Sequence, residues 1–142
     1  SSDLSDLNSQ INSAKRKLGM DSEDMAKTKL NIAKEDDLAV LAIRKEEYAR
    51  LEQEIFKTQN LIAELLSKKE NVSKAPLSFK EFTEVMNSLG DRLKKVQSTT
   101  ELNSIVSKIF SNFTVSSKEV YKYKLNPPFD GLEETKISHG AG

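Results

Sequence analysis

Residues 23–70 read EDMAKTKLNIAKEDDLAVLAIRKEEYARLEQEIFKTQNLIAELLSKKE and contain neither glycine nor proline. The stretch is rich in alanine, leucine, lysine and glutamate, which are strong helix formers. It therefore predicts helix throughout. A straight helix of this length would extend about 70 Å, at 1.5 Å per residue. Such a helix needs a partner along its apolar face, so we expect a coiled coil.

The second half of this stretch carries a regular apolar stripe at helical spacing. Its candidate interaction residues are Tyr48, Leu51, Ile55, Ile62 and Leu65, with Thr58 on the same line. The stripe is suited to bind a helix of another subunit or to pack against residues 23–42 of the same chain, and the two do not exclude each other. For binding between subunits, aspartate at Leu51 and Ile55 is expected to abolish association while the chain stays folded.

The first half of the stretch is less regular, because Asp37, with Asp36 beside it, interrupts its apolar positions. Two arrangements are open. Residues 23–70 form one rod, or they fold near Ile43–Lys45 so that residues 23–42 run antiparallel to residues 46–69. Turn-forming residues are scarce around that point.

Residues 1–22 predict a short helix followed by a hinge. Apolar residues recur at alternating spacings of three and four, which is a heptad seam. They are Leu4, Leu7, Ile11, Ala14 and Leu18. Gly19 follows at once and Asp21-Ser22 offers a new N-cap, so we expect a hinge at residues 19–22. The alternative is one continuous helix that tolerates a single glycine at a cost of about 1 kcal/mol.

Residues 71–112 predict a break and then two short helices. The break ends at Pro76, and Leu77 and Phe82 occupy the positions of a hydrophobic staple. Capping-box spacing occurs twice, once at each helix start. The pairs are Ser78 with Glu81 and Ser98 with Glu101. Apolar residues at helical spacing follow each pair.

Residues 113–125 predict a small β-hairpin. Phe113 and Val115 alternate with polar residues, residues 116–119 form a polar turn, and alternation then resumes. The second alternating set is Tyr121, Lys122, Tyr123, Lys124 and Leu125. Asn126-Pro127-Pro128 stops the strand, because proline has no N–H for the ladder and restricts the residue before it.

The expected fold class is thus mainly α. Coiled-coil helices are followed by two short helices and a small β-hairpin. Residues 1–70 form a coiled-coil arm, residues 71–130 a small α+β terminal module, and residues 131–142 a flexible tail.

The composition excludes several functional classes. Lys+Arg and Asp+Glu both number 22, so the chain lacks the basic footprint of a nucleic-acid-binding domain. There is no cysteine and one histidine, His139, which excludes disulfides, zinc ribbons and thiol catalysis. Neither a membrane-spanning run nor a signal peptide is visible, so we expect no membrane association. Without an initiating methionine, the chain reads as an excised fragment.

No pattern typical of catalysis stands out either. Acid–base catalysis needs two carboxylates in unlike environments, and the dense carboxylates fall on a helix face that we expect to be solvated. They are Asp36, Asp37, Glu46 and Glu47. His139 lies in the expected tail, away from any nucleophile. We therefore assign no catalytic, cofactor-binding or metal-binding residue.

Three lysines define a candidate for contact with DNA phosphates. Lys118, Lys122 and Lys124 are expected to lie together on the exposed side of the β-hairpin. Lysines in such positions also keep an edge strand soluble, which is the alternative interpretation.

Residues 102–114 (LNSIVSKIFSNFT) and 123–130 (YKLNPPFD) resemble the C-terminal end of the large serine site-specific recombinases of the resolvase/invertase group. In that family a helix enters an FSNFT-like strand, a hairpin follows, and an L-x-x-PF exit closes the segment. The match covers about residues 101–130. The coiled coil upstream is similar in kind to the family's coiled-coil arm, and this similarity favours the hairpin over the rod.

The resemblance implies a parent protein with a serine nucleophile, a DNA-binding domain and a zinc ribbon, all outside this chain. No cofactor is then expected here, and zinc belongs to the parent's upstream ribbon. The fragment would be non-catalytic and would join recombinase subunits in the synaptic complex through the coiled coil, while the parent's other domains bind DNA. The implied location is the cytoplasm, with a prokaryotic or mobile-element gene.

Two other functions are compatible with the pattern. One is a structural coiled-coil adaptor unrelated to recombination, in which four phenylalanines of the terminal module dock another protein. They are Phe79, Phe82, Phe110 and Phe113. The other is direct DNA binding through the β-hairpin.

Overall fold

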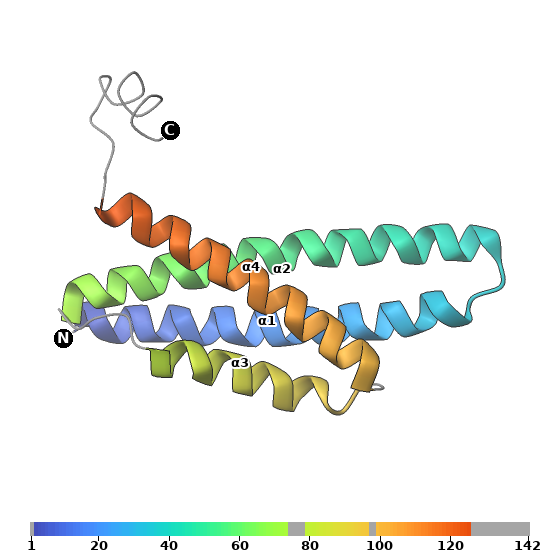
Figure 1. The fold of residues 1–142 in the computed structure, drawn as a ribbon, viewed down its shortest axis with the longest axis horizontal. Helices are drawn as coiled ribbons and strands as arrows, with labels where there is room; N and C mark the ends of the chain where they lie inside the picture. The colour runs from blue at the N-terminus through green and yellow to red at the C-terminus, as the bar shows by residue number, and fades with distance from the viewer. Residues whose placement is uncertain (1, 74–78, 97–98, 126–142) are drawn as a thin grey trace, which may run out of the picture.

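The computed structural model describes residues 2–73, 79–96 and 99–125, which form helices joined by short connections (Figure 1). The helices are α1 (Ser2–Lys34), α2 (Leu38–Ser73), α3 (Phe79–Leu93) and α4 (Thr99–Leu125). None of these helices is both long and apolar enough to cross a bilayer.

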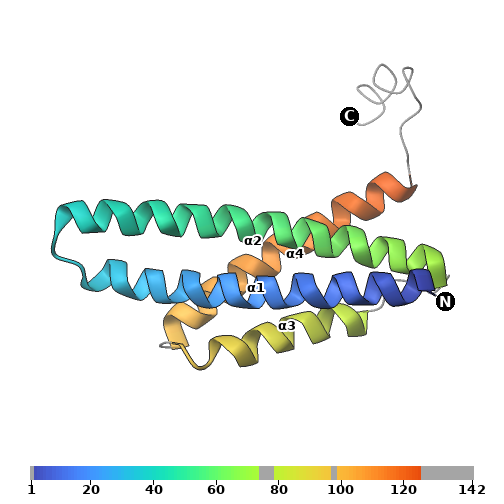
Figure 2. The ribbon, with the colours of Figure 1, turned by 180° about the vertical axis from the view of Figure 1, so that it is seen from behind.

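Helices α1 and α2 form a long antiparallel hairpin, so the rod is wrong and the hairpin is correct (Figures 1 and 2). The chain turns between Lys34 and Leu38, however, and not near Ile43–Lys45. The turn is built by Asp37, whose Oδ1 accepts hydrogen bonds from the backbone N–H of Ala39 at 2.9 Å and of Val40 at 3.1 Å. This is an N-cap, which satisfies two of the free N–H groups at the start of α2.

Helix α1 is continuous through residues 19–22, where we expected a hinge. Gly19 and Ser22 are buried in the middle of the helix, because α3 packs beside them. Tertiary packing thus outweighs the modest helix penalty of one glycine. The predicted heptad seam is confirmed from Leu7 onward, and its members are buried in the core. They are Leu7, Ile11, Ala14 and Leu18.

Helices α3 and α4 complete a single core. Helix α3 lies along α1, and α4 crosses the hairpin at an angle on the same end of the molecule (Figures 1 and 2). Side chains from all four helices join one apolar cluster. It includes Leu18, Met25, Leu51, Ile62, Leu66, Val85, Leu89, Leu93, Ile105, Ile109 and Phe113. The helices after residue 70 therefore share a core with the expected arm and do not have one of their own.

The predicted β-hairpin is wrong, because residues 113–125 continue α4 as helix. Ile105, Ile109 and Phe113 fall on one face of α4, and Phe113 is only 1% exposed. Val115, which a strand would place on the same side as Phe113, is 57% exposed. A helical face that meets the core at every turn overrides a short alternation of apolar and polar residues. The expected exit at Asn126-Pro127-Pro128 and the tail lie outside the described residues.

Candidate interaction site

The end of the α1/α2 hairpin projects beyond α3 and α4 (Figure 1). We call residues 27–50 the hairpin tip. Ala26 is the last buried residue of α1, and Leu51, 1% exposed, is the first of α2. No residue of the tip is buried. The base of the tip touches the rest of the bundle, where Lys29 donates to Ser104 of α4 at 3.3 Å and Tyr48 packs against the core. The tip is thus a two-helix extension of a four-helix core.

The hairpin tip exposes large apolar side chains. Leu38 is 80% exposed and Ile43 is 65% exposed. Further apolar residues of the tip are only half-buried between the two helices. They are Leu30, Ile32, Val40 and Leu41. Among the large apolar side chains of the described residues, Leu38 and Ile43 are the two most exposed. Exposed apolar side chains are common at surfaces that contact another protein.

The turn at the tip is held in one geometry by polar contacts. Arg44 Nε lies 2.8 Å from Glu35 Oε1 across the turn, and the backbone N–H of Asp37 donates to Glu35 Oε2 at 3.2 Å. The hydrogen bond from Arg44 holds the pKa of Glu35 below its ordinary value, and the bond from Asp37 adds to this effect. With the Asp37 cap, these contacts hold the apolar side chains of the tip in a defined turn.

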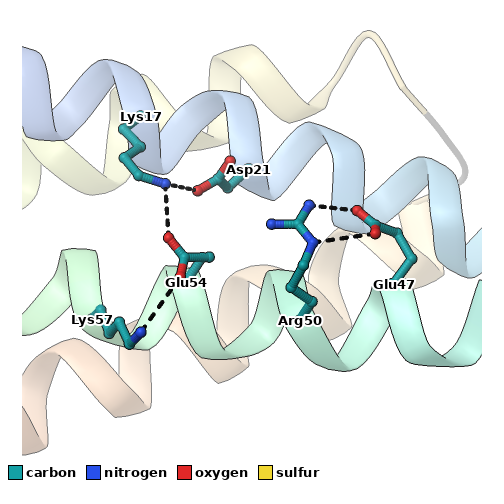
Figure 3. A network of polar contacts seen from close by, with 6 residues as sticks. All are labelled: Lys17, Asp21, Glu47, Arg50, Glu54 and Lys57. Carbon is teal, nitrogen blue, oxygen red and sulfur yellow. Dashed lines mark hydrogen bonds and ion pairs between the residues drawn. The ribbon is translucent and has the colours of Figure 1, made fainter.

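Ion pairs continue from the tip along the hairpin (Figure 3). Arg50 binds Glu47 through two nitrogens, at 3.2 and 2.5 Å. Lys17 on α1 lies 2.6 Å from Asp21 and 3.3 Å from Glu54 on α2, and the hydrogen bond that Lys17 donates to Asp21 is the main reason that the pKa of Lys17 is raised. Exposed ion pairs add little stability. The pair from Lys17 to Glu54, however, joins the two helices. It forms only when α1 and α2 are aligned in the register seen here.

The predicted stripe on α2 lies inside the molecule. Leu51, Ile55, Ile62 and Leu65 are buried in the core, and Tyr48 packs against it half-buried, so that burial raises the pKa of Tyr48. The stripe was expected to bind another subunit or to pack within its own chain. In the structure it packs within its own chain. Its partner there is the rest of the core, with side chains of α1 and α4, and not residues 23–42 alone.

The predicted lysine patch is rearranged because its β-hairpin does not exist. Lys118 and Lys122 are exposed one turn apart on α4 and share a face. Lys124 stands two residues further on, about 200° around a helix of 3.6 residues per turn. The side chain of Lys124 lies outside the described part of the chain.

Helix α4 is attached to α2 by a polar seam that the sequence pattern did not indicate. Gln59 is fully buried, and its Nε2 donates to the carbonyl oxygen of Ile109 at 2.7 Å. Ser116 donates to Asn60, and Lys108 pairs with Glu52. Gln59 follows Thr58, which belongs to the predicted stripe. This neighbour is the sequence feature that places Gln59 near the buried face of α2. The hydrogen bonds of the buried residues Gln59 and Ser116 favour one docking position of α4 over others.

Gly19 allows α3 to approach α1 closely. A methyl group at Gly19 would lie 2.4 Å from Cδ and 2.8 Å from Nε of Arg92. Arg92 Nε in turn lies 2.5 Å from Glu23 Oε2. The glycine thus leaves the space through which the arginine reaches its carboxylate partner.

This arrangement predicts strong coupling between Gly19 and Arg92. In an Arg92→Ala background, Gly19→Ala should raise the free energy of unfolding by about 1 kcal/mol through helix propensity. In the wild-type background, Gly19→Ala should give no gain in the free energy of unfolding, or a loss. The added methyl group would force Arg92 away from Glu23. Urea unfolding of the four proteins measures the difference. Effects that add within about 0.3–0.5 kcal/mol would contradict the close contact.

Comparison with protein-family models, with curated proteins and with solved structures finds no match for this chain. Within the described parts of the chain, no group of three or more histidine, aspartate or glutamate residues is placed to hold a metal ion.

Proposed function

We propose that this chain is an assembly module that joins copies of a larger protein through the hairpin tip. The observation that supports this proposal is the projection of the tip beyond the core, with Leu38 and Ile43 largely exposed at its end. The contact surface differs from the stripe at Tyr48–Leu65, because the stripe is occupied by the chain's own core. The tip can meet a partner without any unfolding.

The partner that suits the tip best is a second copy of the same tip. Residues 27–50 contain six basic residues and five acidic ones, so two copies do not repel each other strongly. The basic set is Lys27, Lys29, Lys34, Arg44, Lys45 and Arg50, and the acidic set is Glu35, Asp36, Asp37, Glu46 and Glu47. Contacts between identical surfaces are the commonest way in which proteins form symmetric dimers.

The larger protein is proposed to be a serine site-specific recombinase, in which the tip joins subunits of the synaptic complex. This step rests on the resemblance of residues 102–114 and 123–130. The strand that the family has in this region is helix here, so the proposal depends on the sequence match alone. The parent's zinc ribbon, its DNA-binding domain and its cytoplasmic location stay predictions.

The second candidate, an adaptor unrelated to recombination, uses the same projecting tip. Of its four docking phenylalanines, Phe113 is buried in the core and Phe110 is 46% exposed. The side chains of Phe79 and Phe82 lie outside the described part of the chain. Salt distinguishes either assembly function from DNA binding through Lys118 and Lys122. DNA affinity falls steeply with ionic strength, whereas apolar contact between tips should hardly respond.

Glutamate at both Leu38 and Ile43 should abolish self-association and leave the bundle folded. Both side chains are largely exposed, and surface substitutions usually change stability by no more than about 0.5 kcal/mol. Sedimentation over a range of concentrations measures the association, and circular dichroism checks the fold. The matched control is Met20→Glu with Val115→Glu, which changes two side chains outside the tip that are 56% and 57% exposed. A tip variant that associates like the wild type, or a wild type that stays monomeric, would contradict the proposal.

A further inference from the structure

We propose that the groove between α1 and α3 binds a phosphate group. The groove contains a hollow of about 70 Å³ whose polar lining is Lys15, Arg16, Ser88 and Arg92. Leu18 and Leu89, both buried, lie beneath it. On the same measure a single water needs about 10–15 Å³, so the hollow has room for a small oxyanion. The proposed site is separate from the hairpin tip and does not depend on the function proposed for it.

Positive charge at the groove exceeds the negative charge that pairs with it. Arg92 pairs with Glu23 through Nε, and its other two guanidinium nitrogens have no further partner among the described residues. Arg16 donates only to the hydroxyl of Ser13, at 3.1 Å, and the ammonium group of Lys15 has no partner in the described part of the chain. Three cationic residues thus line the groove and one carboxylate pairs with one of them, which leaves two positive charges in excess.

The neighbouring acidic groups on α3 do not cancel this excess. Asp91 is exposed and lies 3.6 Å from Lys94. Glu84, one turn before Ser88, is also exposed, and neither carboxylate belongs to the groove lining. Two guanidinium groups, an ammonium group and a hydroxyl supply donors from several directions, and this suits the tetrahedral oxygens of a phosphate better than a planar carboxylate. Gly19 strengthens the site, because its missing side chain lets Arg92 lie low in the groove.

Inorganic phosphate is the probe for the site itself. Titration of the ¹⁵N-labelled full chain should shift the amide signals of Gly19, Ser88 and Leu89 saturably. Lys15→Gln with Arg16→Gln should weaken binding at least about tenfold, which is the usual effect of losing a hydrogen bond to a charged group. Arg92→Lys, which keeps the charge and loses the fork of donors, should weaken it by a smaller factor.

The matched control is Lys57→Gln with Lys68→Gln, which removes two exposed cations from α2. Phosphate affinity at the groove should be unchanged in this variant. The proposal is overturned if the three amide signals do not shift saturably, or if the Lys15 and Arg16 variant binds phosphate as tightly as the wild type.

A short DNA duplex then identifies the source of the phosphate. If the Lys15 and Arg16 variant loses duplex affinity while the control keeps it, the groove binds the backbone phosphates of nucleic acid. If phosphate binds at the groove but the same variant keeps its duplex affinity, the ligand is a free phosphate compound. Both outcomes support a phosphate site, and neither bears on contacts between hairpin tips.

Discussion

Aspartate at both Leu51 and Ile55 is expected to unfold the bundle. The two side chains are 1% and 3% exposed and lie in the core shared by the helices. A buried, unpaired carboxylate costs several kcal/mol, and two together approach the whole stability of an ordinary domain, about 5–15 kcal/mol. Far-ultraviolet circular dichroism and urea unfolding measure the loss.

The same two substitutions were expected from the sequence to break association and leave the chain folded. The matched control is aspartate at Leu38 and Ile43, which are exposed on the same helix and should leave the unfolding midpoint nearly unchanged. If the Leu51 and Ile55 variant retained full helicity and the wild-type midpoint, the stripe would not be the core and would be free for a partner.

Phe113→Ala should lower the free energy of unfolding by about 3–5 kcal/mol, the usual cost of removing a buried aromatic ring. Phe113 is 1% exposed where α4 meets the hairpin. Val115→Ala should change stability by less than about 0.5 kcal/mol, because Val115 is 57% exposed. Urea unfolding of the two variants measures both effects.

This pair of variants distinguishes helix from strand. Residues two apart share a face in a strand and lie on different sides of a helix. A β-hairpin over residues 113–125 would therefore make the two substitutions similarly costly. Similar losses for Phe113→Ala and Val115→Ala would contradict α4.

Part of the fold could be predicted and part could not. The turn at residues 35–37 was within reach, because Asp36-Asp37 breaks the apolar pattern and aspartate is a favoured N-cap. The same two aspartates also fit a helix with an irregular apolar stripe, which leaves a turn near residues 43–45 open. In the structure those residues are part of α2. The groove was harder to find, since Lys15, Arg16 and Arg92 are far apart in sequence and meet only when α3 lies along α1.

The sequence by itself determined that most of residues 23–70 is helical and that residues 7–18 carry an apolar seam, because helix propensity and spacing are local properties. Only the tertiary structure decided which surface remains for a partner. The stripe from Leu51 to Leu65 is apolar whether it binds another chain or its own, and the choice depends on α1 and α4 covering it. The sequence around Phe113 and Val115 likewise fits both the period of a strand and that of a helix. Burial of Phe113 against the other helices favours the helix. Contacts between distant residues supply that energy, so a local pattern cannot reveal it.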